Sequence, residues 1–424
     1  MPEFSSNSRP LRVALVYRYG VHDHKELYPI IPEVLRQLGQ QCETLYIGPN
    51  RKKVGSQYCF PGVSYRFLPF SVNRASTRDK IFKAVLWYAC LPWIALYLRW
   101  FWRADVVWID ESSLPTQGRL LQALSGRPLA ITVCDFFLCI YGETYPWLRW
   151  FEKWLNAVDL RSWRQATGLF TRTASLRQHL VNQGIPPERI EVARDAVLPD
   201  LFVPGDGSAV RRKLGFGADD VVLCHHGILH PNKGMLRVAR WLIPALTADP
   251  HLKLLIVGGG PDLEPLRDWV RQHDQQNQVL LTGWLASHAD VNAHLNAADI
   301  GLVMRIGQPT DHFHVTGALI HSMMCALPVL SCRLEGIQEI ITEGQEGLLF
   351  DPDSGDEFLR KLACLKPDAQ YRREMGRRGR VKALAEFNPD RIARQTVEAL
   401  IRFARQGLPP AECAEPKGSA AGCR

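Results

Sequence analysis

The turn at residues 227–234, GILHPNKG, contains residue types that suit phosphate binding. It follows the apolar run 221–223 and precedes a helical pattern of apolar residues at 236–243. A strand, a glycine-containing turn and a helix bring backbone amides together at one point, and Lys233 would add a fixed positive charge there. A lysine in such a turn is more often simply solvated, so this turn alone does not define a site.

Further strand-to-helix turns follow the first one in a fixed order. They contain Gly258, Gly259 and Gly260 before Pro261, then Gly283, Trp284 and Leu285, then Ala297, Ala298 and Asp299, and finally a loop at 307–316 that opens a helix at Gly317 and precedes the segment EGIQE at 335–339. Glycine lets a backbone approach a ligand closely. The triplet does not have the spacing G-x-G-x-x-G, which disfavours a dinucleotide site.

The elements that must position these turns alternate between strands and helices. We expect strands at 11–17, 42–47, 106–109, 129–134 and 168–171 in the first half, and at 221–225, 252–257, 279–282, 300–304, 328–331 and 347–350 in the second. Such alternation is typical of doubly wound parallel sheets. A polar segment rich in proline and glycine at 204–208 marks the boundary between the halves.

Size and composition fit a two-domain globular protein. The chain has 424 residues, 46% of them hydrophobic, and a net charge of +8, which favours an anionic partner: nucleic acid, a membrane surface or a phosphorylated ligand. The N-terminus does not have the pattern of a secretory signal. The eleven cysteines form no C-x-x-C pair, so we expect buried thiols in a cytoplasmic, reducing compartment rather than disulfides or a metal site.

Aromatic residues are concentrated in the first half, where nine of the twelve tryptophans lie before residue 165. An apolar segment at 84–98 is flanked by basic residues and followed by Trp100 and Trp102. Fifteen helical residues reach about 22 Å, short of a hydrocarbon core of about 30 Å. We therefore expect the segment 82–103 to lie in a membrane interface. A buried core helix and a true span are the alternatives, and a second aromatic and basic cluster at 145–154 has the same chemistry.

The ordered turns resemble those of the retaining GT-B glycosyltransferases of family 4. The resemblance covers about residues 165–402 and includes the segment FNPD at 387–390. It implies a GT-B fold, in which two Rossmann-like doubly wound parallel-sheet domains face a cleft and the last helix returns to the first domain. The implied organisation is an acceptor-binding domain at 1–203, a nucleotide-sugar domain at 204–386, the returning helix at 387–406 and a disordered tail at 407–424.

The resemblance also implies roles for residues of the second half. A UDP- or GDP-sugar would lie in the cleft, with no cofactor or metal ion required. Its diphosphate would contact Lys233 and the amides of Thr316 and Gly317 at a helix start. The implied donor-binding set further contains Gly20, Gly227, Gly258, Gly260, Trp284, Leu285, His321 and Glu339. For Trp284, which would contact the base, ordinary packing remains an alternative.

Several positions depart from the family pattern. Ile228 stands where an arginine is expected, which leaves more of the phosphate charge to Lys233. In the Glu-x7-Glu element, Phe313 takes the first position and His321 the second, where a carboxylate would bind the ribose. A neutral imidazole still offers one donor and one acceptor. Asp311 is our candidate for the sugar contact, unless it is a solvated loop residue.

In the first half, Cys134 and Asp135 stand where the family often has His-Asp. Asp135 is therefore our candidate polar residue near the sugar, with a helix cap as the alternative. Gly20 takes the place of a glycine-rich first loop. With Lys233, Asp311 and His321, Asp135 completes the predicted catalytic set.

The expected function is transfer of a sugar to a lipid-linked or membrane-proximal glycan acceptor by a protein that lies on the inner face of the cytoplasmic membrane. The alternative is a catalytically weak subunit that binds nucleotide sugars or acts as a scaffold at a membrane, which the four departures favour. An oxidoreductase is disfavoured because the first turn lacks the glycine fingerprint. Nucleic-acid binding is disfavoured because the basic residues cluster with apolar runs.

Overall fold

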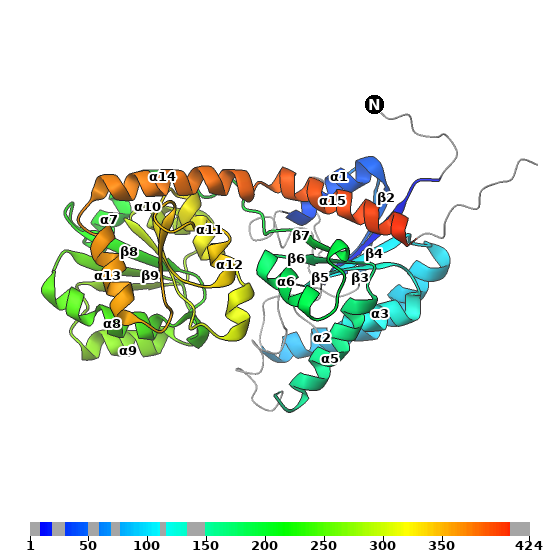
Figure 1. Cartoon of the computed structure of the whole chain (residues 1–424), viewed down its shortest axis with the longest axis horizontal. Coiled ribbons are helices and arrows are strands. Elements are labelled where there is room, and N and C mark those ends of the chain that lie inside the picture. Colours follow the sequence, from blue (N-terminus) through cyan, green and yellow to red (C-terminus); the bar gives the residue numbers. More distant parts are fainter. Residues whose placement is uncertain are drawn as a thin grey trace, which may run out of the picture.

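The computed structural model describes residues 9–18, 30–49, 59–68, 77–110, 116–133 and 149–407, and these form two parallel-sheet domains side by side (Figure 1). The first sheet has the strand order β3-β2-β1-β4-β5-β6-β7 and the second the order β10-β9-β8-β11-β12-β13. Every pairing between neighbouring strands is parallel. The predicted doubly wound α/β architecture is confirmed.

The first domain contains more strands than the sequence indicated. Its strands are β1 (Arg12–Val16), β2 (Glu43–Pro49), β3 (Val63–Leu68), β4 (Val106–Asp110), β5 (Leu129–Val133), β6 (Gly168–Thr171) and β7 (Ile190–Val192). Its helices are α1 (Ile30–Gln41), α2 (Thr77–Leu96), α3 (Gln117–Ser125), α5 (Arg149–Gln165) and α6 (Ala174–Asn182). We did not predict β3, an edge strand with partly exposed residues, or the three-residue β7, because neither has a buried apolar run.

The second domain has all six predicted strands. They are β8 (Val221–His226), β9 (Leu252–Val257), β10 (Val279–Gly283), β11 (Ile300–Val303), β12 (Val329–Cys332) and β13 (Gly347–Phe350). The helices are α7 (Ser208–Leu214), α8 (Met235–Ala248), α9 (Leu263–Gln272), α10 (His288–Asn296), α11 (Gly317–Met324), α12 (Glu335–Gln338), α13 (Gly355–Leu365) and α14 (Ala369–Glu386). Short 3-10 turns lie at Pro231–Lys233 and Pro309–Phe313.

The last helix, α15 (Pro389–Gln406), leaves the second domain and packs on the first one beside α1 (Figure 1). Asn388 caps its start, and one face contributes Ile392, Val397, Leu400 and Phe403 to the core of the first domain. The first domain therefore cannot complete its core without the C-terminal end of the chain.

The helix α2 is longer than predicted and continues through Pro92 into a π-helical turn at Tyr97–Phe101. The length argument against a membrane span is therefore wrong, since residues 82–101 form a helix long and apolar enough to cross a bilayer by length and composition alone. One face of α2, however, packs in the core of the first domain. The residues of that face are Trp87, Leu91, Ile94 and Ala95, and Leu98 of the π-helical turn continues it. The indole of Trp87 donates a hydrogen bond to the side chain of Gln117 (2.9 Å).

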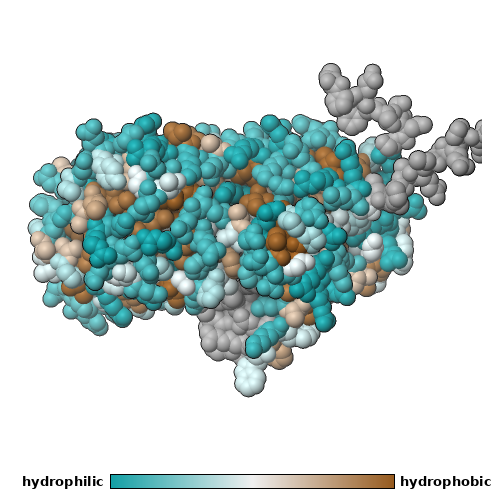
Figure 2. Space-filling model, in the orientation of Figure 1, coloured by the Kyte–Doolittle hydropathy of each residue, from teal (hydrophilic) through white to brown (hydrophobic). Residues whose placement is uncertain are grey.

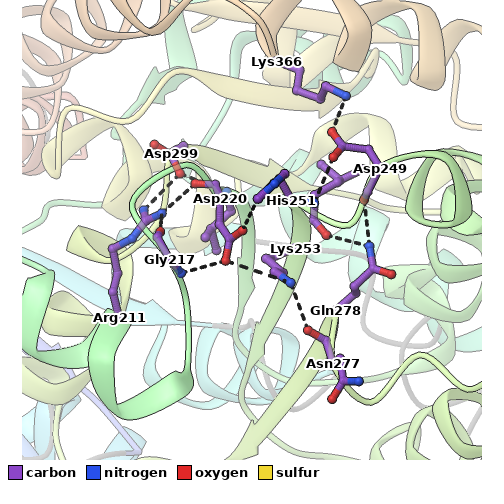
Figure 3. A network of polar contacts seen from close by, with 12 residues as sticks. Arg211, Gly217, Asp220, Asp249, His251, Lys253, Asn277, Gln278, Asp299 and Lys366 are labelled. Carbon is purple, nitrogen blue, oxygen red and sulfur yellow. Dashed lines mark hydrogen bonds and ion pairs between the residues drawn. The ribbon is translucent and has the colours of Figure 1, made fainter.

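A network of hydrogen bonds and ion pairs connects the amino ends of the strands in the second sheet (Figure 3). The carboxylate of Asp299 accepts hydrogen bonds from the amide of Val222 (2.9 Å) and from Arg211 (3.2 Å), and it lies 3.8 Å from the guanidinium of Arg372. Asp220 accepts from the amide of Gly217 in the same network. This edge is opposite to the carboxyl ends of the strands and leaves those ends available for a site.

We predict that Asp299→Ala lowers the free energy of unfolding by about 2–3 kcal/mol, because it leaves the buried guanidinium of Arg372 without its carboxylate. The change is measured as a shift of the urea unfolding midpoint. Asp268→Ala is the control, since Asp268 forms an exposed pair with Arg271 and its loss should cost under about 0.5 kcal/mol. Equal effects of the two substitutions would contradict the assignment.

Candidate functional site

The candidate site lies at the carboxyl edge of the second sheet, where the strand order reverses. β8 lies between β9 and β11, so chain connections leave β8 and β11 in opposite directions. Ligands of open α/β sheets bind in the crevice at such a switch point. The turn 227–234 follows β8, and the helix α11 follows β11.

Two glycine turns pack directly on each other beside this point. A Cβ on Gly258 would lie 1.9 Å from the carbonyl oxygen of Gly227, and one on Gly260 would lie 2.3 Å from that of Leu229. Both Gly258 and Gly260 have positive φ, and the amide of Leu229 donates to the carbonyl of Gly259 (2.9 Å). Gly258 and Gly260 are therefore required because the two turns approach each other too closely for a Cβ atom. Their contact with a donor stays a prediction.

Lys233 ends the 3-10 turn that bridges the switch point. Its amide donates to the carbonyl of His230 (2.7 Å), and the carbonyl of Asn232 accepts from the amide of Ile306 beyond β11 (3.1 Å). The side chain of Lys233 is partly buried, and its charge contributes to a lowered pKa of His225, about 4, for which burial is the main cause. The backbone of the turn that contains Lys233 is thus held between the ends of β8 and β11.

Trp284 lies over the glycine turns. Its side chain is 66% exposed, and a Cβ on Gly259 would come within 2.6 Å of the indole nitrogen, so the ring packs on bare backbone. Leu285 is partly buried against the core. An exposed aromatic ring beside these turns is suited to stacking on a base, so packing does not account for the whole indole.

The start of α11 faces the same edge. The hydroxyl of Thr316 caps it by accepting from the amide of Leu319 (3.4 Å), and Gly317 is exposed. Helix N-termini attract anions because their first amides point outward. Thr316 and Gly317 are therefore placed as the resemblance implies, and their contact with diphosphate stays a prediction.

His321 lies one turn into α11 and contacts a second histidine that we did not predict. Its Nδ1 is 3.0 Å from Nε2 of His226, the last residue of β8, and its ring stacks on that of Phe202 with centroids 3.8 Å apart. Burial lowers the pKa of His321 to about 3 and lowers that of His226 well below its ordinary value. Both imidazoles are therefore neutral near pH 7. The sequence signal for His226 was its place at a strand end directly before Gly227.

Asp311 is not placed for the predicted sugar contact. Its side chain is 2% exposed, and one oxygen forms an ion pair with Arg305 (2.5 Å) while the other accepts from the amide of Gln308 (3.1 Å). Because both oxygens are occupied inside the domain, Asp311 stabilises the loop that precedes α11.

Glu339 also has partners other than the predicted donor, and they belong to the first domain. Its two oxygens accept from the amides of Ala174 (2.9 Å) and Ser175 (2.7 Å) at the start of α6, and Arg194 lies 3.2 Å away. A carboxylate at a helix N-terminus neutralises otherwise unpaired amides and the positive end of the helix dipole. Figure 1 shows α12 and α6 facing each other where this contact forms.

Two further contacts join the same surfaces. The hydroxyl of Thr173 donates to the carbonyl of Phe313 (2.9 Å), and the ring of Phe313 packs on that of His179 with centroids 4.8 Å apart. We call Glu339, Thr173, Ser175 and Phe313 the interdomain clasp. Phe313, which replaces a predicted carboxylate, therefore serves domain contact.

Two candidates of the first half, Gly20 and Asp135, lie outside the described residues. Ile228, at the position of the missing arginine, is 50% exposed. Within the described part of the chain, no three His, Cys, Asp or Glu side chains are grouped so as to hold a metal ion.

Two family models match the chain, one in each domain. The first, described as a glycosyl transferase 4-like domain, matches residues 58–195, and the second, described as glycosyl transferases group 1, matches residues 220–368. Together they cover about two thirds of the sequence. The fold and the two matches define a glycosyltransferase, and the chain belongs to the group 1 glycosyltransferases.

Curated relatives are distant. The alpha-maltose-1-phosphate synthase of Mycolicibacterium smegmatis is 26% identical over 304 residues, which are 66% of this chain and 74% of that protein. The D-inositol 3-phosphate glycosyltransferase of Stackebrandtia nassauensis is 27% identical over 49% of this chain and 48% of its own length. The chain thus spans about half of that relative.

Solved structures share the fold at low identity. HepE from Anabaena, solved in complex with UDP, superposes with a TM-score of 0.70 at 17% identity, over 92% of this chain and 100% of its own. The apo form of WaaB, a lipopolysaccharide outer core galactosyltransferase, gives a TM-score of 0.60 at 15% identity, over 92% of this chain and 99% of its own. These likenesses confirm the GT-B fold.

We predict that the interdomain clasp holds the two domains together. Glu339→Ala leaves two amides of α6 without their carboxylate, so we expect the two domains to separate more readily and the radius of gyration from small-angle X-ray scattering to rise. The loss of a helix cap should also lower stability by about 1 kcal/mol.

Glu335→Ala is the matched control, because Glu335 begins the short helix α12 that ends directly before Glu339, and its side chain is 59% exposed beside His312. It should leave the scattering curve unchanged. If Glu339→Ala scatters like this control, the clasp does not hold the domains.

Proposed function

We propose that this glycosyltransferase retains the anomeric configuration and moves a sugar from a UDP- or GDP-sugar to a lipid-linked or membrane-proximal glycan acceptor, in the synthesis of surface polysaccharide or glycolipid. The proposed binding of the nucleotide sugar rests on one observation. Lys233, the start of α11 and His321 meet at the switch point between β8 and β11. The complexes of HepE with UDP and with UDP-glucose support a uridine nucleotide as the first donor to test.

In the proposed reaction the bond between C1 of the sugar and the diphosphate oxygen breaks, and the acceptor oxygen bonds to C1 on the same face. The acceptor proton passes to a phosphate oxygen of the leaving nucleotide, so no separate protein base is needed. Lys233 and the amides at the start of α11 stabilise the negative charge that develops on the diphosphate. No step of this scheme requires a metal ion.

The acceptor side rests on an exposed apolar face of the first domain. Along α2 and the following π turn, Phe82, Val85, Trp93 and Trp100 are 61%, 61%, 74% and 60% exposed. They recur at nearly helical spacing on the face opposite to the buried one, with Ala89 also exposed between them. A helix that is apolar on both faces, with one face in the protein core, has its other face available to lipid.

The helix α5 adds a second part to this surface. Trp150, Phe151 and Trp154 are 88%, 54% and 63% exposed, and the exposed Lys153 and Arg161 lie on the same helix. Both α2 and α5 pack against α3, and Figure 1 shows all three on the same side of the first domain. In Figure 2 hydrophilic residues cover most of the visible face, so a cluster of exposed tryptophans departs from the general character of the surface.

We propose that this surface docks on an anionic membrane, with tryptophans at headgroup depth and arginines on the phosphates. The buried face of α2 disfavours insertion across the bilayer. In the most apolar part of the helix at 82–101, 28% of the residues lie inside the protein and would have to leave the core. We also propose a cytoplasmic location on the inner face of the membrane.

The donor site is tested with a panel of UDP- and GDP-sugars. Purified protein should hydrolyse or transfer the sugar of one of them, and Lys233→Ala should lower this rate about a hundredfold or more, since Ile228 supplies no second cation. Release of nucleotide is measured, with and without a chelator, and Lys361→Ala in the exposed pair with Glu343 is the control.

If no member of the panel binds at millimolar concentration, the enzyme proposal fails. Binding without turnover would favour the alternative, a nucleotide-sugar-binding or scaffold subunit.

Membrane docking is tested by flotation with vesicles that contain anionic lipid. The wild-type protein should float at low salt, and the double variant Trp93→Ser/Trp150→Ser should bind at least about tenfold more weakly, because it removes exposed aromatic area. Trp284→Ser is the control, since Trp284 is also an exposed tryptophan, at 66%, but lies on the other domain. Absence of the wild-type protein from the floating fraction would exclude the docking surface.

A further inference from the structure

The contact between His226 and His321 leaves one ring nitrogen without a partner. His226 is 7% exposed, and its Nδ1 is a buried atom with no hydrogen-bond partner in the described part of the chain. Its Nε2 is the atom that meets Nδ1 of His321 at 3.0 Å. The position of the shared proton therefore determines whether the unpaired Nδ1 of His226 is a donor or an acceptor.

The two possible arrangements differ in cost. If the proton of His226 were on Nδ1, a buried N–H would have no acceptor, which is rare in native proteins. If it is on Nε2, only an acceptor lone pair is unpaired, and His226 donates to Nδ1 of His321. In this second arrangement His321 carries its own proton on Nε2. The lower pKa of both groups is consistent with a single proton on each ring.

The Cε1 and Nε2 atoms of His321 lie closest to the start of α11. A Cβ on Gly317 would lie 3.4 Å from Cε1 and 3.7 Å from Nε2 of that ring, and Gly317 itself is exposed. Phe202 stacks on the ring at an interplanar angle of 9° and restricts its rotation. An N–H at this place adds a neutral donor to the amides of the helix start.

We propose that His226 is a positioning residue that keeps His321 neutral with its proton on Nε2. The Nε2–H group then donates a hydrogen bond to an oxygen of the bound nucleotide. This rests on the proposed function for the identity of the ligand. The oxygen belongs either to a ribose hydroxyl or to the diphosphate, and both present a lone pair to an N–H. A carboxylate at position 321 could only accept hydrogen bonds from the nucleotide, whereas the imidazole of His321 donates one. The direction of the hydrogen bond at this subsite is therefore reversed.

The protonation pattern is tested without any nucleotide. Histidine labelled with ¹⁵N, observed through its two-bond couplings to ring protons, distinguishes the two neutral tautomers. We expect the Nε2–H form for both His226 and His321 near pH 7, with assignment by single substitution. The Nδ1–H form of His321 would overturn the proposal whatever the protein binds.

The positioning role is tested by calorimetric binding of UDP, 2′-deoxy-UDP, 3′-deoxy-UDP and UMP. His226→Leu removes the donor to His321 and should weaken UDP binding about fivefold, whereas His226→Gln keeps an N–H donor and should restore most of the affinity. If ribose is the partner, the loss disappears with one deoxy nucleotide. If a β-phosphate oxygen is the partner, the loss persists with both deoxy nucleotides and disappears with UMP, whereas an α-phosphate oxygen, which UMP retains, gives a loss with all four nucleotides.

His225→Leu is the matched control. His225 is the neighbouring buried histidine, but it points to the other side of the strand and contacts the carbonyl of Leu302 (3.1 Å). It should leave the discrimination among the four nucleotides as in the wild type. Equal affinity of His226→Leu and wild type for all four would overturn the positioning role, while absence of binding by the wild type would count against the proposed function instead.

Discussion

The contact between the carboxylate of Glu339 and the first amides of α6 is the interaction on which the geometry of the cleft depends. Each sheet gathers its functional turns at the carboxyl ends of its strands, but the two edges form a single site only when the domains face each other. The clasp supplies this orientation with main-chain donors of one domain and a side chain of the other. The returning helix α15 joins the domains at a second place, through the core beside α1. Two attachments at separate points restrict rotation about either one alone.

The clasp also shows what two residues of the donor-associated segments contact in this chain. Phe313 and Glu339 belong to segments that the resemblance assigns to the donor, and in this chain their side chains contact α6. A motif defines which residues follow one another in sequence, but it does not determine whether a side chain turns toward the ligand or toward the other domain. Asp311 shows the same limit, because its partner Arg305 precedes the predicted site loop and gave no sequence signal of its own.

The architecture was predictable because it depends on local patterns that repeat. Six apolar runs, each followed by turn residues and a helical pattern, defined the six strands of the second sheet, and the position of Lys233 followed from the turn that contains it. The edge strand β3 and the continuation of α2 through Pro92 were not predictable in the same way. Val63–Leu68 alternates between apolar and polar residues and forms no apolar run, because one of its sides is exposed. Pro92 is tolerated because Leu91 before it and Ile94 after it both pack in the core and hold the helix on either side.

The replacement of a carboxylate by His321 has a consequence for charge in the cleft. A carboxylate next to a diphosphate adds a negative charge that the protein must offset, and this chain has Ile228 in place of one of the two expected cations. In the proposed donor site, a neutral imidazole at position 321 removes a negative charge beside the nucleotide where a positive one is also missing, so Lys233 alone would offset the charge of the leaving group. Within that proposal, the departures at 228 and 321 compensate each other in charge. Read in this way, they argue for a working donor site with altered polarity more strongly than for a site that has lost its function.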